Sequence, residues 1–116
     1  MTVAATGYGT FSIALGTIND IALPNRYTLY QNYPNPFNPV TVLQYDLPEF
    51  SDVKLTIYDL AGRQVRNLVH ETQTSGLKTI VWDGRDDRGN KMGAGVYIYQ
   101  LKTDNFIASK KMILVK

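Results

Sequence analysis

Apolar and polar side chains alternate along this chain at a spacing of two residues, in one segment after another. Leu43, Tyr45 and Leu47, for example, share one side of their segment. A period of two is typical of a β-strand, and no window shows the 3.6-residue period of an amphipathic helix. Glycine, proline, asparagine and aspartate separate the segments, so the sequence predicts an all-β sandwich of antiparallel strands with almost no helix. The predicted strands span residues 27–30, 40–47, 53–58, 64–69, 79–82, 96–101 and 106–115.

The only tryptophan, Trp82, ends one of these segments and opens a polar loop that contains four glycines. Glycine takes positive φ angles at little cost, and Asp and Asn bind their own backbone, so we expect turn geometry to hold this loop. The alternative is a calcium loop, with Asp83, Asp86, Asp87 and Asn90 as the candidate ligands. The order of an EF-hand loop and its closing glutamate are missing, and Arg85 and Arg88 stand among the acids. We therefore predict no metal and no other cofactor.

The strand after this loop carries two tyrosines on one face, again by the two-residue period. We expect them to pack with the tryptophan, so the predicted structural core centres on Trp82, Tyr97 and Tyr99. A lone tryptophan that follows an apolar alternation is usually buried between sheets. The alternative for Trp82 is a solvent-facing platform for a sugar.

Three prolines exclude regular structure between Gln31 and Pro39, because proline lacks a backbone N–H and restricts the residue before it. We predict an ordered loop that Tyr33 and Phe37 anchor on the end of the sandwich. The alternative is a docking motif for a peptide-type partner. The loop residues singled out are Asn35, Pro36, Phe37, Asn38 and Pro39.

The composition argues against several classes of function. Twelve basic and ten acidic residues give a net charge of +2, and the charges are interspersed, so we expect no nucleic-acid partner. The chain has no cysteine, and its one histidine, His70, is expected in a surface turn. The carboxylates are spread along turns, and the sequence lacks the nucleophile, phosphate-loop and zinc-protease motifs. We therefore predict that the chain is not an enzyme.

Residues 1–22 differ from the rest of the chain. Residues 1–5 lack the basic side chains of a secretory signal, and Phe11, Ile13 and Leu15 alternate within a strand pattern over residues 8–18. We interpret residues 1–22 as an N-terminal extension or the end of an upstream linker or domain, with residues 8–18 as a spare strand. Residues 23–116 then form the sandwich domain.

Several motifs in this order resemble the type A C-terminal sorting domain of the type IX secretion system. They are Leu29 to Thr41, Ile57 to Asp59 with Gly62-Arg63, Trp82 to Asp86 with Gly89, Gly95 to Tyr97, and Lys111-Met112 with Leu114 and Lys116. The chain is also similar, more distantly, to the immunoglobulin-like domain of flagellar hook-capping proteins. That domain shares the Trp-Asp-Gly loop but not the Asn-Pro-Phe-Asn-Pro stretch. The resemblance implies an immunoglobulin-like antiparallel β-sandwich of about seven strands.

For function, the resemblance implies a non-catalytic module that directs an upstream cargo protein through the periplasm to the outer surface. The implied partners are outer-membrane secretion machinery and a sortase-like peptidase, and the implied location is the cell surface or the medium. The recognition residues implied by position are Lys110, Lys111, Met112, Leu114 and Lys116. The alternative is a structural module that self-associates through edge strands or binds a glycan.

Overall fold

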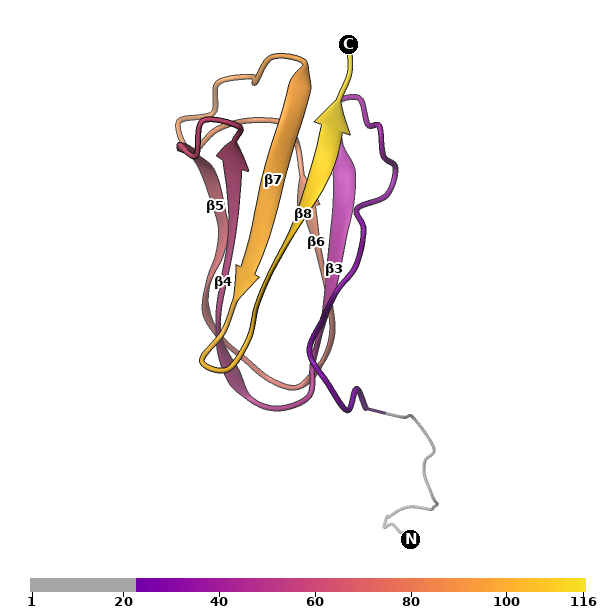
Figure 1. Cartoon of the computed structure of the whole chain (residues 1–116), viewed down its shortest axis with the longest axis vertical. Helices are drawn as coiled ribbons and strands as arrows, with labels where there is room; N and C mark the ends of the chain where they lie inside the picture. Colours follow the sequence, from indigo (N-terminus) through magenta and orange to yellow (C-terminus); the bar gives the residue numbers. More distant parts are fainter. Residues whose placement is uncertain (1–22) are drawn as a thin grey trace, which may run out of the picture.

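The computed structural model describes residues 23–116, so the strand predicted at residues 8–18 lies outside the described part (Figure 1). Within residues 23–116 there are seven strands and no helix, which confirms the predicted all-β class and the number of strands. No helix long and apolar enough to cross a membrane occurs in this range. The strands are β2 (Thr28–Leu29), β3 (Thr41–Leu47), β4 (Ser51–Asp59), β5 (Gln64–Gln73), β6 (Gly76–Trp82), β7 (Gly95–Lys102) and β8 (Ile107–Leu114).

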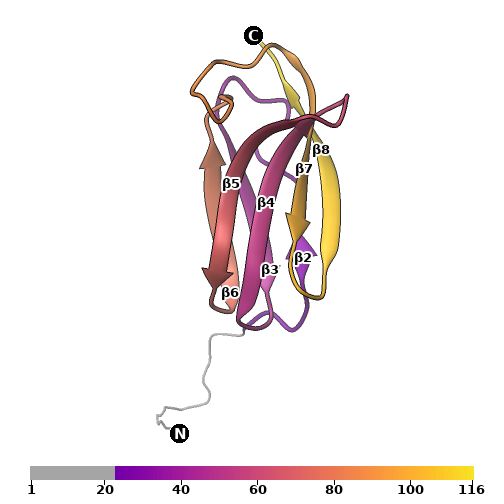
Figure 2. The same ribbon diagram turned by 90° about the vertical axis from the view of Figure 1, so that its left-hand side faces the viewer.

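Two antiparallel sheets face each other across the core. One has the strand order β2-β3-β6 and the other the order β5-β4-β7-β8. Seen from the side, β5 and β6 lie along one margin of the sandwich, and β8 and β2 lie along the other (Figure 2). The strand alternation therefore produced the predicted immunoglobulin-like sandwich, because each strand buries one face against the opposite sheet.

The core follows the two-residue period of the strands. In β3 the side chains of Leu43, Tyr45 and Leu47 are buried, and their neighbours are half-buried. The Trp82 ring is completely buried at one end of the core, where its centroid lies 5.7 Å from the ring of Phe37 and 5.5 Å from that of Tyr97. Tyr99, on the same face as Tyr97, is also fully buried.

The strand β5 is longer than predicted. Its pairing with β4 continues to the register partners Ser51 and Gln73, so it runs past the expected end at residue 69. The prediction of a surface turn at His70 was therefore wrong in part: His70 is exposed, but it lies in the strand, opposite Lys54. Residues 70–73 carry no apolar alternation, and it is pairing with the neighbouring strand that extends them.

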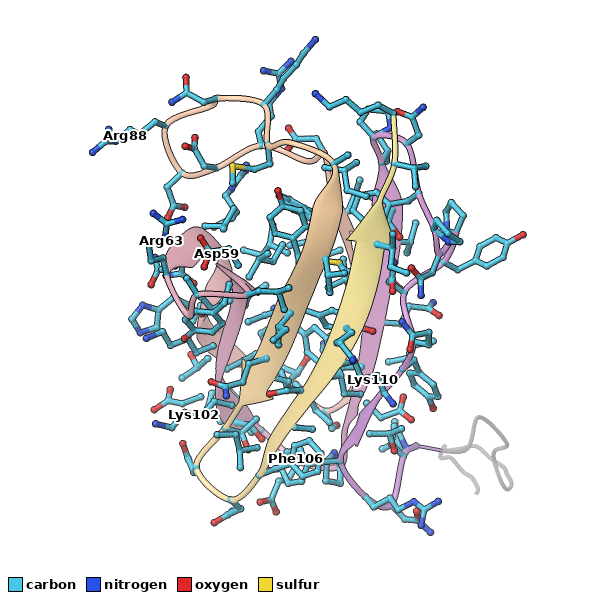
Figure 3. All side chains as sticks on the ribbon, turned by 45° about the horizontal axis from the view of Figure 1, so that its top comes forward. Asp59, Arg63, Arg88, Lys102, Phe106 and Lys110 are labelled. Carbon is cyan, nitrogen blue, oxygen red and sulfur yellow. The ribbon has the colours of Figure 1, made fainter. Side chains whose placement is uncertain are left out.

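The β4–β5 turn is held by Asp59 and Arg63, which point toward each other in Figure 3. Gly62 has φ of 84°, which glycine adopts without steric cost. The Asp59 carboxylate accepts hydrogen bonds from the backbone N–H of Arg63 and from its Nε, both at 2.9 Å. The backbone bond and then the guanidinium hold the pKa of Asp59 below its ordinary value. This ion pair is surface-exposed, so we expect it to fix the geometry of the turn and to add little to the free energy of unfolding.

Two tyrosine hydroxyls buried in the core predict a loss of stability at high pH. Burial raises the pKa of Tyr45 and of Tyr99 to about 12, from an ordinary value of 10.0. The unfolded chain loses these protons above about pH 10, whereas the folded protein keeps them until about pH 12. We expect the free energy of unfolding to fall as the pH rises through this window. Urea titrations at pH 8, 10, 11 and 12 measure this free energy. A value that does not change with pH would contradict the raised pKa of the two tyrosines.

Candidate functional site

The strand β8 forms the edge of the four-stranded sheet, paired with β7 from Gly95–Leu114 to Lys102–Ile107. The even-numbered residues of β8 share its inward face. Among them, Met112 is 0% exposed and Leu114 is 3% exposed. The resemblance to sorting domains implies both as recognition residues. In the folded domain both side chains fill the core, and their role in recognition stays a prediction.

The lysines of this segment point in different directions. Lys111 is exposed on the outer face together with Ile113. Lys110 has the inward parity of Met112, but it is only half-buried at the margin of the sheet (Figure 3). Lys116 is exposed beyond the strand. The surface side chains that this segment presents are therefore the lysines, Ile113 and Val115.

The proline-rich loop covers the outer edge of β8 near the end of the strand. Phe37 runs parallel to Leu114, its N–H donates to the carbonyl of Ile113, and its carbonyl accepts from the N–H of Val115, both at 2.9 Å. The Asn35 side-chain oxygen accepts from the N–H of Ile113 at 3.0 Å. In addition, Gln31 Nε2 donates to the carbonyl of Lys111 at 2.9 Å. The loop thus occupies backbone positions that a further strand would otherwise use.

Asn32 and Thr41 fix this loop from inside, and neither was predicted from the sequence. Asn32 is 2% exposed; its Nδ2 donates to Thr41 Oγ1 at 2.9 Å and to the carbonyl of Pro34 at 3.1 Å. Its backbone N–H donates to the Tyr99 hydroxyl at 2.8 Å, and that hydroxyl donates to the carbonyl of Tyr30 at 2.6 Å. A signal was available for Thr41, because it occupies an inward position of β3. A buried polar network of this kind holds one loop conformation.

Only one of the two predicted aromatic anchors of the loop is an anchor. Phe37 is 1% exposed and packs against Trp82, whereas Tyr33 is 79% exposed. Tyr33 exchanges two backbone hydrogen bonds with Val42 of β3, which directs its ring to the outer face of the three-stranded sheet. The prediction that Tyr33 anchors the loop through its side chain was therefore wrong.

The acidic loop after Trp82 uses its carboxylates within the fold. Asp86 Oδ1 accepts from the N–H groups of Arg88 and Asn90, and these bonds, that of Asn90 first, hold the pKa of Asp86 below its ordinary value. Asp87 Oδ1 accepts from the N–H of Asn67 at 3.0 Å, and Asp83 Oδ1 from the N–H of Arg85 at 3.1 Å. Asp83, Asp86 and Asp87 thus accept from different backbone donors, and Asn90 is itself a donor to Asp86. Among residues 23–116, no three histidine, aspartate or glutamate side chains gather in a metal-binding group.

Removing divalent cations is expected to leave the fold unchanged, because backbone donors and arginines already occupy these carboxylates. The melting temperature measured with excess EDTA should equal that measured with calcium to within experimental error. The Asp86→Asn variant keeps the size of the side chain while removing its charge, and its melting temperature is measured in the same two conditions for comparison. A fall in melting temperature with EDTA that calcium restores would contradict this prediction.

Three segments that are far apart in the sequence meet at the end of the sandwich that holds Trp82: the proline-rich loop, the acidic loop and the end of β8. Gly84 has φ of 76°, and a Cβ at this position would lie 3.0 Å from the carbonyl oxygen of Pro39, so glycine permits the two loops to touch. Trp82 Nε1 donates to the carbonyl of Arg85 at 2.9 Å and fixes the start of the acidic loop. A pocket of about 270 Å³ lies between the segments, lined by Asn38, Pro39, Asp83, Gly84, Arg85, Lys91, Met92, Leu114, Val115 and Lys116. The proline-rich loop, the acidic loop and the end of the chain after β7 thus line one pocket.

The family is decided by the residues that build most of the sandwich. Residues 38–105 match the model of the FlgD Ig-like domain. The chain belongs to the FlgD Ig-like domain family. The resemblance to flagellar hook-capping domains drawn from the sequence is therefore confirmed. Among curated proteins, none matches the sequence significantly.

Solved structures share the fold of this FlgD Ig-like domain. PorZ, described as an essential surface component of the type IX secretion system of Porphyromonas gingivalis, matches with a TM-score of 0.53 and 19% identity over 76% of this chain. Dimeric latent PorU from the same species matches with 0.62 and 24% over 87%. FlgD from P. aeruginosa matches with 0.52 and 23% over 81% of this chain and 77% of its own. The match spans only 11% of PorZ and 10% of PorU.

The family match leaves out two segments of the candidate surface. It begins at residue 38 and ends at residue 105, so Gln31 to Phe37 and the whole of β8 lie outside it. These two segments hydrogen-bond to each other along the edge of β8. The family match alone therefore does not describe the contact between the first loop and the last strand.

Proposed function

We propose that this FlgD Ig-like domain is a non-catalytic sorting and anchoring module of the type IX secretion route. It directs an upstream cargo protein through the periplasm to the outer surface, and outer-membrane machinery reads its last strand together with the proline-rich loop. The observation that carries the proposal is the clasp of Gln31, Asn35 and Phe37 on the edge of β8. The clasp joins the two motif segments that fall outside the general family match.

The arrangement supports recognition by surface geometry. The loop fixes the end of β8, and Lys110, Lys111 and Lys116 flank it with positive charge. In the described residues these lysines have no carboxylate within ion-pair distance. A partner with acidic groups would gain from these charges, and charge complementarity raises both specificity and association rate. The fold that the chain shares with PorZ agrees with a role on this route.

An export assay tests the proposal. A reporter with its own export signal, fused upstream of the 116-residue chain, should reach the surface of a host that has type IX machinery. Replacing Lys110, Lys111 and Lys116 by Gln should reduce surface display several-fold. The free energy of unfolding should change by less than about 1 kcal/mol, because Lys111 and Lys116 are exposed and Lys110 is only half-buried. Surface labelling of intact cells measures display, and urea unfolding of the purified chain measures stability.

Two further variants make the result interpretable. Replacing Lys54, Lys78 and Lys102 by Gln makes the same change in charge outside residues 110–116, away from the clasped end of β8, and should leave display unchanged. A chain without residues 110–116 should leave the reporter in the periplasm. If the first triple variant is displayed as well as wild type, the lysines are not read, and recognition lies in the backbone edge or the loop. If the shortened chain is also displayed, the sorting proposal is wrong.

The second candidate function is a structural module of an extracellular assembly. The membership in the FlgD Ig-like family favours it, because the match covers the sandwich without the two distinctive segments. In this case the fusion would remain in the periplasm even with intact β8, and the export assay separates the two candidates.

A further inference from the structure

Within residues 23–116 the sandwich has four strand edges, and three of them carry a feature that hinders pairing. The proline-rich loop covers the end of β8, and β2 has only two residues. At the start of β5, the N–H of Asp87 donates to the carbonyl of Val65 at 2.9 Å, and the exposed part of that strand carries His70 and Glu71. Covering loops, charges and short strands are the usual means of preventing edge pairing. The remaining edge belongs to β6.

Hydrogen-bond directions identify which groups of β6 face outward. The N–H and carbonyl of Val42 both bond to Tyr33, so Val42 directs its backbone away from β6. These directions alternate along a strand, and therefore Thr41, Leu43 and Tyr45 bond to their β6 partners. The β6 residues between those partners point their backbone groups away from β3, and these residues are Leu77, Thr79 and Val81. Within residues 23–116, no hydrogen bond to their outward groups is present.

The side chains on the outward face of this edge carry no charge. Leu77 is 56% exposed and Val81 is 53% exposed, with Thr79 exposed between them. The one charged residue of the strand, Lys78, has its backbone bonded to β3, and its Nζ donates to Thr74 Oγ1 at 3.1 Å. Figure 2 shows β6 at the margin of its sheet. Lys78 is the one charge on this strand and lies on its other face. Within residues 23–116 the outward backbone groups have no partner, and such an edge is a template for another strand.

The edge is complementary to itself. In an antiparallel pair with a two-fold axis at Thr79, each Thr79 faces its own copy, and Leu77 faces Val81 of the second molecule. This is the one register in which all three outward residues of each copy find an outward partner. Apolar pairs and threonine pairs in direct opposition stabilise a sheet. Lys78 then stands opposite Ile80 of the partner copy, so the two Lys78 side chains are diagonal to each other and no like charges are in direct opposition.

We propose that β6 pairs with β6 of a second copy of this chain, forming a homodimer with one six-stranded sheet. A two-fold axis makes such an interface isologous, so it closes at two molecules and does not propagate into a filament. The sheet order becomes β2-β3-β6 followed by the same strands of the partner in reverse. The clasp on β8 lies at the opposite margin of the sandwich and stays free in the dimer.

Substitution on the axis tests the dimer with the full 116-residue chain. Sedimentation equilibrium over about 10 μM to 1 mM should show a reversible monomer–dimer equilibrium, as expected for a small interface. Thr79→Lys places two like charges in direct opposition and should raise the dissociation constant by at least about tenfold. Thr79→Glu should do the same. An equimolar mixture of the two variants should form a heterodimer, because the axis now pairs opposite charges.

Thr72→Lys on β5 is the matched control, since it adds the same charge at an exposed strand threonine away from the axis. It should dimerise like wild type. Dimerisation of Thr79→Lys as strong as wild type, or failure of the mixture to form a heterodimer, would overturn the proposal. A chain that stays monomeric at every concentration would also overturn it. In that case, slow hydrogen exchange at the Leu77, Thr79 and Val81 amides would mean that another segment of the same chain covers the edge.

Discussion

Trp82→Ala is expected to destabilise the domain by ~3–5 kcal/mol, because a completely buried aromatic ring loses both its transfer free energy and its packing. The ring contacts Phe37 from the proline-rich loop and Tyr97 from β7, so the cavity opens where three segments meet. The substitution also leaves the carbonyl of Arg85 without its indole donor. Urea unfolding followed by circular dichroism measures the change.

Two comparisons define what the Trp82 result means. Trp82→Phe keeps most of the ring but removes the indole N–H, and it should cost clearly less than Trp82→Ala. Phe50→Ala removes an aromatic ring that is 68% exposed, and it should lie within about 0.5 kcal/mol of wild type. A loss below about 1 kcal/mol for Trp82→Ala would show that the ring is accessible in solution, and the sugar-platform alternative would then gain support.

Phe37→Ala has the second large expected effect, also ~3–5 kcal/mol. Phe37 is buried, and its backbone bonds to both Ile113 and Val115, so loss of the ring loosens the clasp on β8. We expect the amides of Ile113 and Val115 to exchange faster with solvent than in wild type. Amide hydrogen exchange by NMR, together with urea unfolding, measures both effects.

Tyr33→Ala is the matched control, because it removes an aromatic side chain from the same loop. The Tyr33 ring is 79% exposed, so the free energy of unfolding should stay within about 0.5 kcal/mol of wild type. Exchange at Ile113 and Val115 should not change. Equal losses for the two variants would mean that both rings anchor the loop, as the sequence alone suggests.

The strands could be predicted because their signal is local. The alternation of Leu43, Tyr45 and Leu47 is visible within one segment, and the structure buries the same side chains. The extension of β5 to Gln73 could not be predicted, since those residues are held in a strand by pairing with β4. The sequence also could not rank Tyr33 against Phe37, because the choice depends on which ring reaches Trp82.

The candidate surface was predictable only as a set of separate motifs. Prolines marked the loop as irregular, and glycines marked the turn after Trp82, but nothing in either stretch indicates that they touch. Their contact depends on the approach of Gly84 to Pro39. The buried position of Asn32 depends on Tyr99, which is 67 residues away along the chain. Long-range placement of this kind is set by the packing of the two sheets and not by local pattern.

The clasp on β8 also determines when this domain can be completed. Its hydrogen bonds join Gln31 to Lys111 and Asn35 to Ile113, partners that are 80 and 78 residues apart. Contacts so distant in sequence form late, because the chain between them must be ordered first. A polypeptide that becomes available in order from its N-terminus therefore cannot complete the sandwich until β8 is available as well. Closure of the clasp reports that the chain has arrived as far as β8, and a chain truncated before that strand cannot present the finished surface.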